Sequence, residues 1–201
     1  MRTKTRSAKS ALKQLYNGVV QPRRPLLFLD FDDVICLNDP YGGFDVFQPT
    51  HEHPADLWDK LFAEEPKRLL LHIAREFEPH VVLTTSWLRL MERPGFESLF
   101  RRTGLSALVP MLHEQWEAPQ ARGANRWQAI ETWLAAHYEG QPVVVLDDTL
   151  SGTGLAESPL HFTGRVVLCE VGVGLTSSCL DRIRTMLPPG GQGTVSPAPK
   201  A

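Results

Sequence analysis

Four short apolar runs divide the chain, and loops or helical patterns separate them. They occupy residues 26–29, 81–83, 143–146 and 166–169, and none of them alternates with polar residues. Short continuous apolar runs are typical of strands that are buried on both faces of a parallel sheet. The pattern therefore predicts four parallel strands in the interior of the protein.

Apolar residues recur at helical spacing in the segments between and after these runs. The spacing predicts helices within residues 57–62, 69–77, 96–102, 126–137 and 180–187, and a short one at 10–16. Residues 38–55 resemble a loop, and residues 108–112 are compatible with a strand or a turn. Strands that alternate with helices favour right-handed crossovers. We therefore predict an α/β protein with a Rossmann-like parallel sheet and helices on both faces.

Carboxylate and hydroxyl side chains follow three of the four apolar runs. They are Asp30, Asp32 and Asp33 after the first, Thr84, Thr85 and Ser86 after the second, and Asp147 and Asp148 after the third. The carboxyl ends of parallel strands meet at one edge of the sheet, where ligands bind in open α/β folds. Two carboxylates about 4 Å apart repel by roughly 4 kcal/mol at an effective dielectric constant near 20. Such a pair needs a metal ion, a shared proton or a basic partner. An Asp-rich turn after the first strand is the simpler alternative.

These side chains suit phosphoryl transfer. Mg²⁺ favours a few carboxylates together with water and substrate phosphate. One aspartate can act as the nucleophile that receives the phosphoryl group. A second carboxyl group can protonate the leaving oxygen and then activate water. Asp30 and Asp32 are two residues apart on an extended chain, so they point the same way and can converge on one cation.

The order of these segments resembles the four motifs of the haloacid dehalogenase-like (HAD) superfamily, most of whose members are Mg²⁺-dependent phosphatases. The resemblance covers about residues 26–187. It implies a HAD-like fold with a minimal cap, the nucleophile on Asp30 and the acid/base on Asp32. It also implies a Mg²⁺ site formed by four carboxylates, those of Asp30, Asp32, Asp147 and Asp148.

The same resemblance implies which groups bind the substrate phosphate. It places the phosphate-binding hydroxyl on Thr85, with Thr84 as the alternative, and Ser86 follows directly. It places the cation of the third motif on Arg126, where Lys is usual, with Arg122 as the alternative. Arg supplies the charge, but its planar fork differs in shape from an ammonium group. Asp33 stands where Gly is common, and it either adds charge near the site or caps the following turn.

Three local patterns are similar to those of a small HAD group associated with RNA-repair (Swiss Army Knife) proteins. They are Thr85-Ser86-Trp87, the segment 126–134 that leads to Asp147-Asp148, and Gly174-Leu175-Thr176 before the last helix. A minimal cap leaves the site open. We therefore expect a phosphorylated and bulky substrate, such as a nucleic-acid end or a phosphoprotein. Trp87 either lines the pocket or belongs to the core.

Composition and charge predict how the chain divides into segments and where in the cell the protein is found. The chain has 201 residues, of which 42% are hydrophobic and 22% charged, as in ordinary globular proteins. Residues 1–24 hold basic residues and no acidic ones, which predicts a basic, flexible arm that could contact nucleic acid. We expect residues 25–187 to form the catalytic domain and residues 188–201 to form a disordered tail. Three cysteines without CxxC spacing, and the lack of an apolar span or signal peptide, predict a cytoplasmic protein without a membrane partner.

Two other functions compete with the phosphatase hypothesis. A catalytically silent HAD-like module could bind nucleic acid or a protein partner. A response-regulator receiver domain is also an acidic α/β protein, but it would have a lone phospho-accepting Asp in mid-chain and a Lys after a late strand. Here the paired acids come first, and no Lys directly follows residues 166–170, so we exclude the receiver domain. The sequence predicts no oligomeric state.

Overall fold

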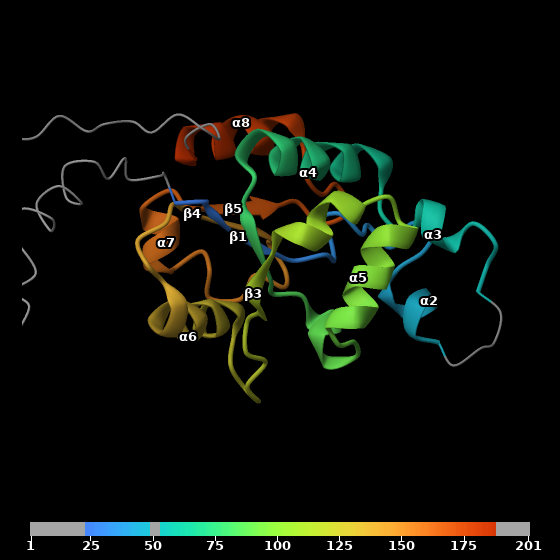
Figure 1. The fold of residues 1–201 in the computed structure, drawn as a ribbon, viewed down its shortest axis with the longest axis horizontal. Coiled ribbons are helices and arrows are strands. Elements are labelled where there is room, and N and C mark those ends of the chain that lie inside the picture. The colour runs from blue at the N-terminus through green and yellow to red at the C-terminus, as the bar shows by residue number, and fades with distance from the viewer. Residues whose placement is uncertain (1–22, 49–52, 188–201) are drawn as a thin grey trace, which may run out of the picture.

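A computed structural model describes residues 23–48 and 53–187. Their centre is a five-stranded parallel sheet with strand order β3-β2-β1-β4-β5 (Figure 1). The strands are β1 (Leu26–Leu29), β2 (His80–Leu83), β3 (Leu112–Glu117), β4 (Val143–Asp148) and β5 (Val166–Cys169). The prediction of an α/β protein with a Rossmann-like parallel sheet is confirmed.

The sheet is covered on both faces, which explains why its central strands are apolar without alternation. Side chains of β1 point in turn to opposite faces. Leu27 and Leu29 join the core under α4 (Glu64–Phe77) and α8 (Ser177–Met186). Phe28 joins the core under α6 (Arg126–His137), where its ring meets Trp133 edge to face at 5.3 Å. Figure 1 shows α4 and α8 on one side of the sheet, and α6 and α7 (Pro159–Phe162) on the other.

The edge strand β3 differs from the sequence-based expectation. The segment expected as a strand or turn at 108–112 belongs mainly to the 3-10 helix η2 (Ser106–Met111), and the strand begins at Leu112. Its register with β2 shifts between the Val81–Leu112 and Leu83–Glu117 pairs. After Leu112 its residues are exposed or half-buried. An edge strand that buries few side chains needs no apolar run, so the hydrophobic pattern could not reveal it.

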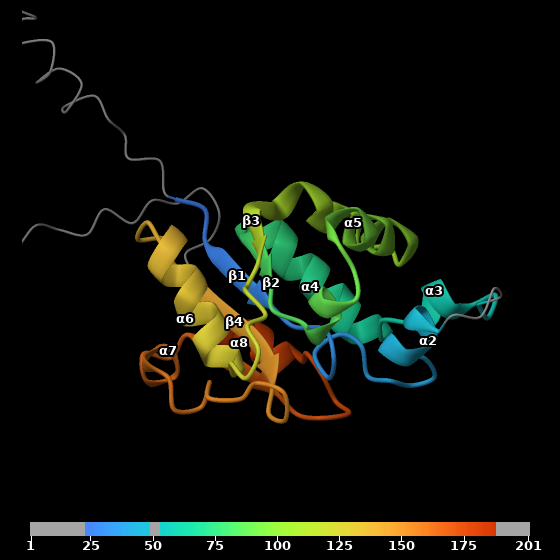
Figure 2. The same cartoon turned by 90° about the horizontal axis from the view of Figure 1, so that it is seen from below.

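The segment between β1 and α4 forms a small cap. It contains the short helices α2 (Gly43–Phe47) and α3 (Leu57–Lys60), although its first part was expected to be a loop. Figure 2 shows both helices beside α5 (Arg93–Arg102), at the end of the molecule away from α6 and α7. Two helices of this size do not form a separate cap domain over the carboxyl ends of the strands.

The predicted domain boundaries fall partly outside the described residues. The short helix expected at 10–16, most of the basic arm and the tail at 188–201 all lie there. Of the arm's basic residues, Arg23 pairs with Glu139 at 3.1 Å, and Arg24 donates to the Glu78 carbonyl at 2.7 Å. Glu78 precedes β2, and Glu139 precedes β4, so these contacts lie at the amino ends of the strands.

In the part of the chain that the structure describes, no helix is long and apolar enough to cross a bilayer.

Candidate active site

Three buried aspartates converge at the carboxyl ends of β1 and β4. Asp30 directly follows β1, while Asp147 and Asp148 end β4, and the two strands are hydrogen-bonded neighbours. Each of the three offers a carboxylate oxygen within 4.8 Å of the others. Burial, followed by the charge of Asp30, raises the pKa of Asp147 well above its usual value. The cluster therefore stores electrostatic repulsion that a cation would relieve.

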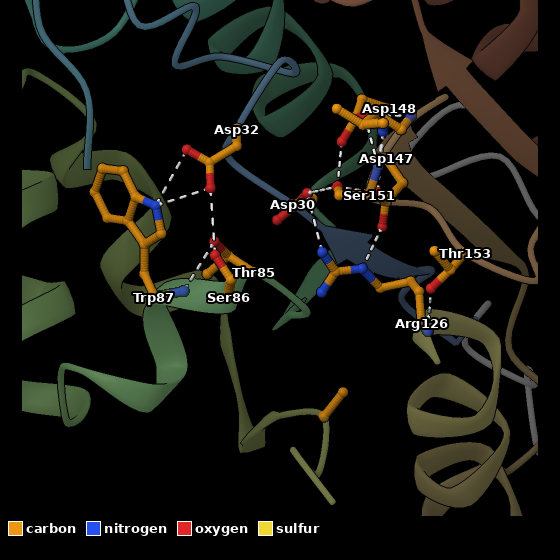
Figure 3. Close-up of polar contacts among 12 residues, drawn as sticks. Asp30, Asp32, Thr85, Ser86, Trp87, Arg126, Asp147, Asp148, Ser151 and Thr153 are labelled. Carbon is orange, nitrogen blue, oxygen red and sulfur yellow. Dashed lines mark hydrogen bonds and ion pairs between the residues drawn. The ribbon is translucent and has the colours of Figure 1, made fainter. Parts of the chain in front are cut away.

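Arg126 supplies part of that positive charge. Its Nη2 lies 3.1 Å from Asp30 Oδ2, and its Nε lies 2.8 Å from Asp147 Oδ2 (Figure 3). The Nε–H is not aligned for a hydrogen bond, so we treat the second contact as an ion pair. Only 8% of the Arg126 side chain is exposed, whereas Arg122, the alternative for the third motif, is exposed. Of these two arginines, the structure brings Arg126 to Asp30, the residue that the family resemblance assigns as the nucleophile.

Local signals in the sequence place Arg126 at the first position of α6. Asn125 caps the helix, because its Oδ1 accepts from Gln128 N at 2.8 Å. In turn, the side-chain oxygen of Gln128 accepts from Asn125 N at 2.9 Å. This reciprocal pair fixes where the helix begins. Arg126 N donates to Thr153 Oγ1 at 3.2 Å, which ties the helix start to the loop after β4. A cation at a helix N-terminus is disfavoured by the helix dipole, so the aspartates must offset that cost.

Ser151 was missed in the sequence, yet it lies inside the carboxylate cluster. Its Oγ is 2.9 Å from Asp30 Oδ2, 3.2 Å from Asp147 Oδ1, and also contacts Asp148 Oδ2. One hydroxyl proton can satisfy only one of these oxygens at a time. The signal that could have found it is its position in the turn that directly follows the strand-ending Asp148.

Asp32 occupies a separate position in the site. Its carboxylate accepts from Trp87 Nε1 at 3.0 and 3.2 Å and from Ser86 Oγ at 3.3 Å (Figure 3). Burial, and then the charge of Asp30, raises its pKa to about 6. Near neutral pH such a group can give a proton and later take one back. The carboxylate turns away from the three-aspartate cluster, and its predicted role as a metal ligand stays a prediction.

Trp87 combines the two roles that the sequence left open. It is 3% exposed, and its ring meets those of Phe31 and Phe47 edge to face at 5.4 Å each. At the same time its indole N–H holds Asp32. The core therefore fixes the orientation of a polar side chain in the site, which the sequence pattern alone could not show.

The two threonines after β2 are both fully buried. Thr85 Oγ1 accepts from Trp87 N at 3.4 Å at the start of the 3-10 helix η1 (Ser86–Arg89). Thr84 Oγ1 has no hydrogen-bond partner among the described residues. Each hydroxyl still has a proton to donate to a phosphate oxygen. The preference for Thr85 over Thr84 therefore stays a prediction.

Asp33 has a structural role. Its φ is 53°, in the left-handed region that Asp adopts more readily than most residues, and its N donates to the Cys36 carbonyl at 2.8 Å. Its Oδ1 accepts from Gly172 N at 2.8 Å, in the loop after β5. The third carboxylate of the opening segment thus closes a turn and ties it to a neighbouring loop. This role matches the expectation that Asp33 caps the turn that follows the first strand.

The donor set fits a hard divalent cation. Asp30 Oδ1 and Asp147 Oδ2 are buried without a hydrogen-bond partner among the described residues, beside the carboxylate of Asp148. Carboxylate oxygens are the ligands that Mg²⁺ and similar cations prefer. Asp30, Asp147 and Asp148 are therefore the residues that would hold the ion.

The charge balance of the cluster leads to a first prediction. Arg126→Ala leaves three buried carboxylates without their cation, and we expect it to lower the unfolding free energy by about 3 to 5 kcal/mol at pH 7.5 without divalent ions. Burial, followed by the charge of Asp30, raises the pKa of Asp147, so this group binds a proton more tightly in the folded protein than in the unfolded chain. Folding then takes up protons, so stability falls as the pH rises, and the loss should shrink at pH 5.5. Urea unfolding at the two pH values measures both effects.

Two variants control for this prediction. Arg126→Lys keeps the charge and should lose less stability than the alanine variant. Arg122→Ala removes an exposed residue of the same type, four positions earlier, and should change the unfolding free energy little. An equal loss in Arg126→Ala at both pH values would show that packing, not charge, is what the side chain contributes.

Comparison with known families agrees with this geometry. The model of a family described as the HAD domain in Swiss Army Knife RNA repair proteins matches residues 26–179. That segment contains β1 to β5, the three buried aspartates and Arg126. No curated protein and no solved structure matches the chain significantly. On the extent of the family match and the shared fold, the chain belongs to the family of HAD domains found in Swiss Army Knife RNA repair proteins.

Proposed function

We propose that the protein is a Mg²⁺-dependent phosphohydrolase that acts through an aspartyl-phosphate on Asp30. The observation that carries the proposal is the buried Asp30–Asp147–Asp148 cluster, paired to Arg126, with Asp32 held separately beside it. A purely structural cluster would gain nothing from three buried carboxylates around one arginine. A site for a metal ion and a phosphoryl group gains from all of them.

The chemistry takes two steps. A carboxylate oxygen of Asp30 attacks phosphorus, and the bond from phosphorus to the leaving oxygen breaks while that oxygen takes the proton of Asp32. The Asp32 carboxylate then accepts a proton from water, which attacks the phosphorus of the aspartyl-phosphate and releases phosphate and free Asp30. Bound Mg²⁺ supplies positive charge that offsets the negative charge of the carboxylates and the transferring group.

The remaining residues position the phosphoryl group. Arg126 donates to its oxygens from the side of Asp30. The hydroxyls of Thr84 and Thr85 are buried at the end of the neighbouring strand, and Ser86 lies exposed after them. The small cap formed by α2 and α3 leaves room for a bulky substrate, such as a nucleic-acid end or a phosphoprotein. We keep the cytoplasm as the proposed compartment.

A phosphate-release screen with Mg²⁺ and with EDTA tests the function. The panel holds nucleotides, 3′- and 5′-phosphorylated oligonucleotides, phosphopeptides and small phosphometabolites. We expect Mg²⁺-dependent release, with the bulky substrates preferred. Release from phosphometabolites alone would contradict the substrate proposal, and no release from any compound would favour a catalytically silent binding module.

Metal binding can be measured without turnover, and this is a second prediction. At about 100 times its Kd, Mg²⁺ should stabilise the protein by about 2.7 kcal/mol, which corresponds to a rise in Tm of about 5 to 10 °C for a domain of this size. Asp148→Asn removes a cluster carboxylate and should reduce the shift. Asp32→Asn should keep it, because the Asp32 carboxylate is turned towards Trp87. An equal loss of the shift in both variants would place Asp32 among the ligands.

A further inference from the structure

The small cap and the 3-10 helix η1 line an open cavity beside Asp32 and Ser86. Its volume is about 580 Å³, within the range of small-molecule sites. The apolar side chains that line it are Phe44, Phe47, Trp87 and Leu90, and we call this cavity the aromatic cleft. Asp32 and Ser86 line it as well. The aromatic cleft is therefore continuous with the acid/base position of the catalytic site.

The aromatic cleft is built against Trp87, whose indole N–H holds Asp32. A Cβ on Gly43 would lie 2.9 Å from Trp87 Nε1, so α2 begins directly on the indole that holds Asp32. The Phe47 ring meets Trp87 at 5.4 Å with an interplanar angle of 85°. Phe44 extends from the same short helix with 78% of its surface exposed, and Leu90 is 64% exposed. Exposed apolar side chains that line a cavity beside polar groups, here Phe44 and Leu90, are typical of a binding surface.

The chemistry of the proposed reaction decides which part of the substrate enters the aromatic cleft. The attacking and leaving oxygens lie on opposite sides of the phosphorus in an in-line transfer. Asp30 attacks from one side, and Asp32 gives its proton to the leaving oxygen on the other. The leaving group must therefore extend past Asp32, and the surface beyond Asp32 is the aromatic cleft.

The side chains in the aromatic cleft favour a nucleoside as this leaving group. Near the phosphoryl position, Asp32 and Ser86 offer polar atoms that suit sugar hydroxyls. Farther out, Phe44 offers a ring face for stacking, and the amide of Asn38 can pair with the edge of a base. The described residues that line the aromatic cleft include no Lys or Arg, so a second phosphate has no partner there.

A phosphotyrosine fits this order of groups less well. Its ring is bonded directly to the ester oxygen and would lie against the polar side chains of Asp32 and Ser86. The peptide backbone beyond it has no ring to stack on the exposed Phe44 side chain, whereas a base has one.

We infer that the aromatic cleft is the subsite for the terminal nucleoside of a phosphorylated nucleic-acid end, with the base stacked on Phe44. This inference rests on the proposed function, because it uses the direction of phosphoryl transfer. It selects the nucleic-acid end over the phosphoprotein and assigns substrate specificity to α2.

Oligonucleotides with and without their terminal base provide the test. Two otherwise identical 3′- or 5′-phosphorylated strands are compared, one with a terminal base and one with a terminal abasic residue. Loss of the base should lower kcat/KM about 5- to 100-fold, in line with the usual contribution of a base stacked on an aromatic side chain. Phe44→Ala should lower kcat/KM for the complete strand and bring its ratio to kcat/KM for the abasic strand close to 1. Phe44→Trp should restore the difference.

Phe162 provides the matched control. It is the same residue type with the same exposure, 78%, and it lies on α7 and does not line the aromatic cleft. Phe162→Ala should hydrolyse both strands as the wild type does. Equal kcat/KM for the two strands in the wild type would overturn the inference. A tyrosine-phosphorylated peptide hydrolysed better than the complete strand would overturn it as well.

A binding measurement separates failure of this inference from failure of the proposed function. The Asp30→Asn protein, with and without Phe44→Ala, is titrated with the same two strands by calorimetry in the presence of Mg²⁺. A base-dependent Kd that disappears with Phe44→Ala supports the subsite even if no strand is hydrolysed. A Kd that does not depend on the terminal base overturns the subsite, whether or not the protein releases phosphate.

Discussion

Asp30→Asn should abolish turnover while the protein remains folded. The substitution keeps the shape of the side chain but removes the nucleophilic carboxylate, so we expect kcat to fall by at least about 10⁴-fold. Asn can still accept from Ser151, and Arg126 keeps Asp147 as its partner. One negative charge leaves a buried cluster, so the Tm without metal should be unchanged or higher. Phosphate release and thermal unfolding measure the two effects.

Asp33→Asn is the matched control for this prediction. It changes the same residue type three positions later, in a carboxylate that accepts from Gly172 N at 2.8 Å and takes no part in the proposed reaction. The amide oxygen can replace that acceptor, and we expect turnover close to that of the wild type.

Wild-type protein that is quenched during turnover of a labelled substrate should carry a hydroxylamine-sensitive label, and the Asp30→Asn protein should carry none. Full activity in Asp30→Asn would exclude the covalent route.

The fold could be predicted because its central strands are buried on both faces. Each residue of β1 must be apolar to be wholly buried, which gives a run that needs no alignment to recognise. The helix at 126–137 was equally clear, because its apolar residues follow the helical period. The structure adds the capping pair of Asn125 and Gln128 at its start. The edge strand β3 buries little, and its side chains left no comparable signal.

The site could be predicted only as far as strand ends determine it. Parallel strands bring Asp30, Asp147 and Asp148 to one edge whatever the details of packing. The role of Ser151 depends on how the turn after β4 folds back, and that turn has no periodic pattern. The hydrogen bond from Trp87 to Asp32 depends on how the core orients the indole ring. The spacing of residues in the sequence does not show the direction of a side chain. Asp33 could not be separated from its neighbours because its role follows from a left-handed backbone conformation.

Asp32→Asn should slow the reaction by about 10² to 10⁴-fold with alkyl leaving groups, the usual contribution of a general acid or base. The loss should differ between the two steps. A nitrophenyl ester needs little protonation of its leaving oxygen, so Asp30 should still be phosphorylated quickly. Hydrolysis of the aspartyl-phosphate still needs the Asp32 carboxylate as the base for water. We therefore expect a burst of nitrophenol equal to the enzyme concentration, followed by slow turnover. Enzyme phosphorylated on Asp30 should accumulate during the slow phase.

Trp87→Phe tests whether the indole N–H positions this acid/base. Phenylalanine keeps an aromatic ring among Phe31 and Phe47 but removes the donor that lies 3.0 Å from Asp32 Oδ2. The carboxylate remains and can still transfer a proton, so kcat for an alkyl ester should fall by less than in Asp32→Asn. The loss in the rate of the first step should be smaller with the nitrophenyl ester, because that step then needs no acid. Equal losses in the first step with both esters would show that Trp87 supports the fold of the site rather than proton transfer to the leaving group, since only that transfer depends on the leaving group.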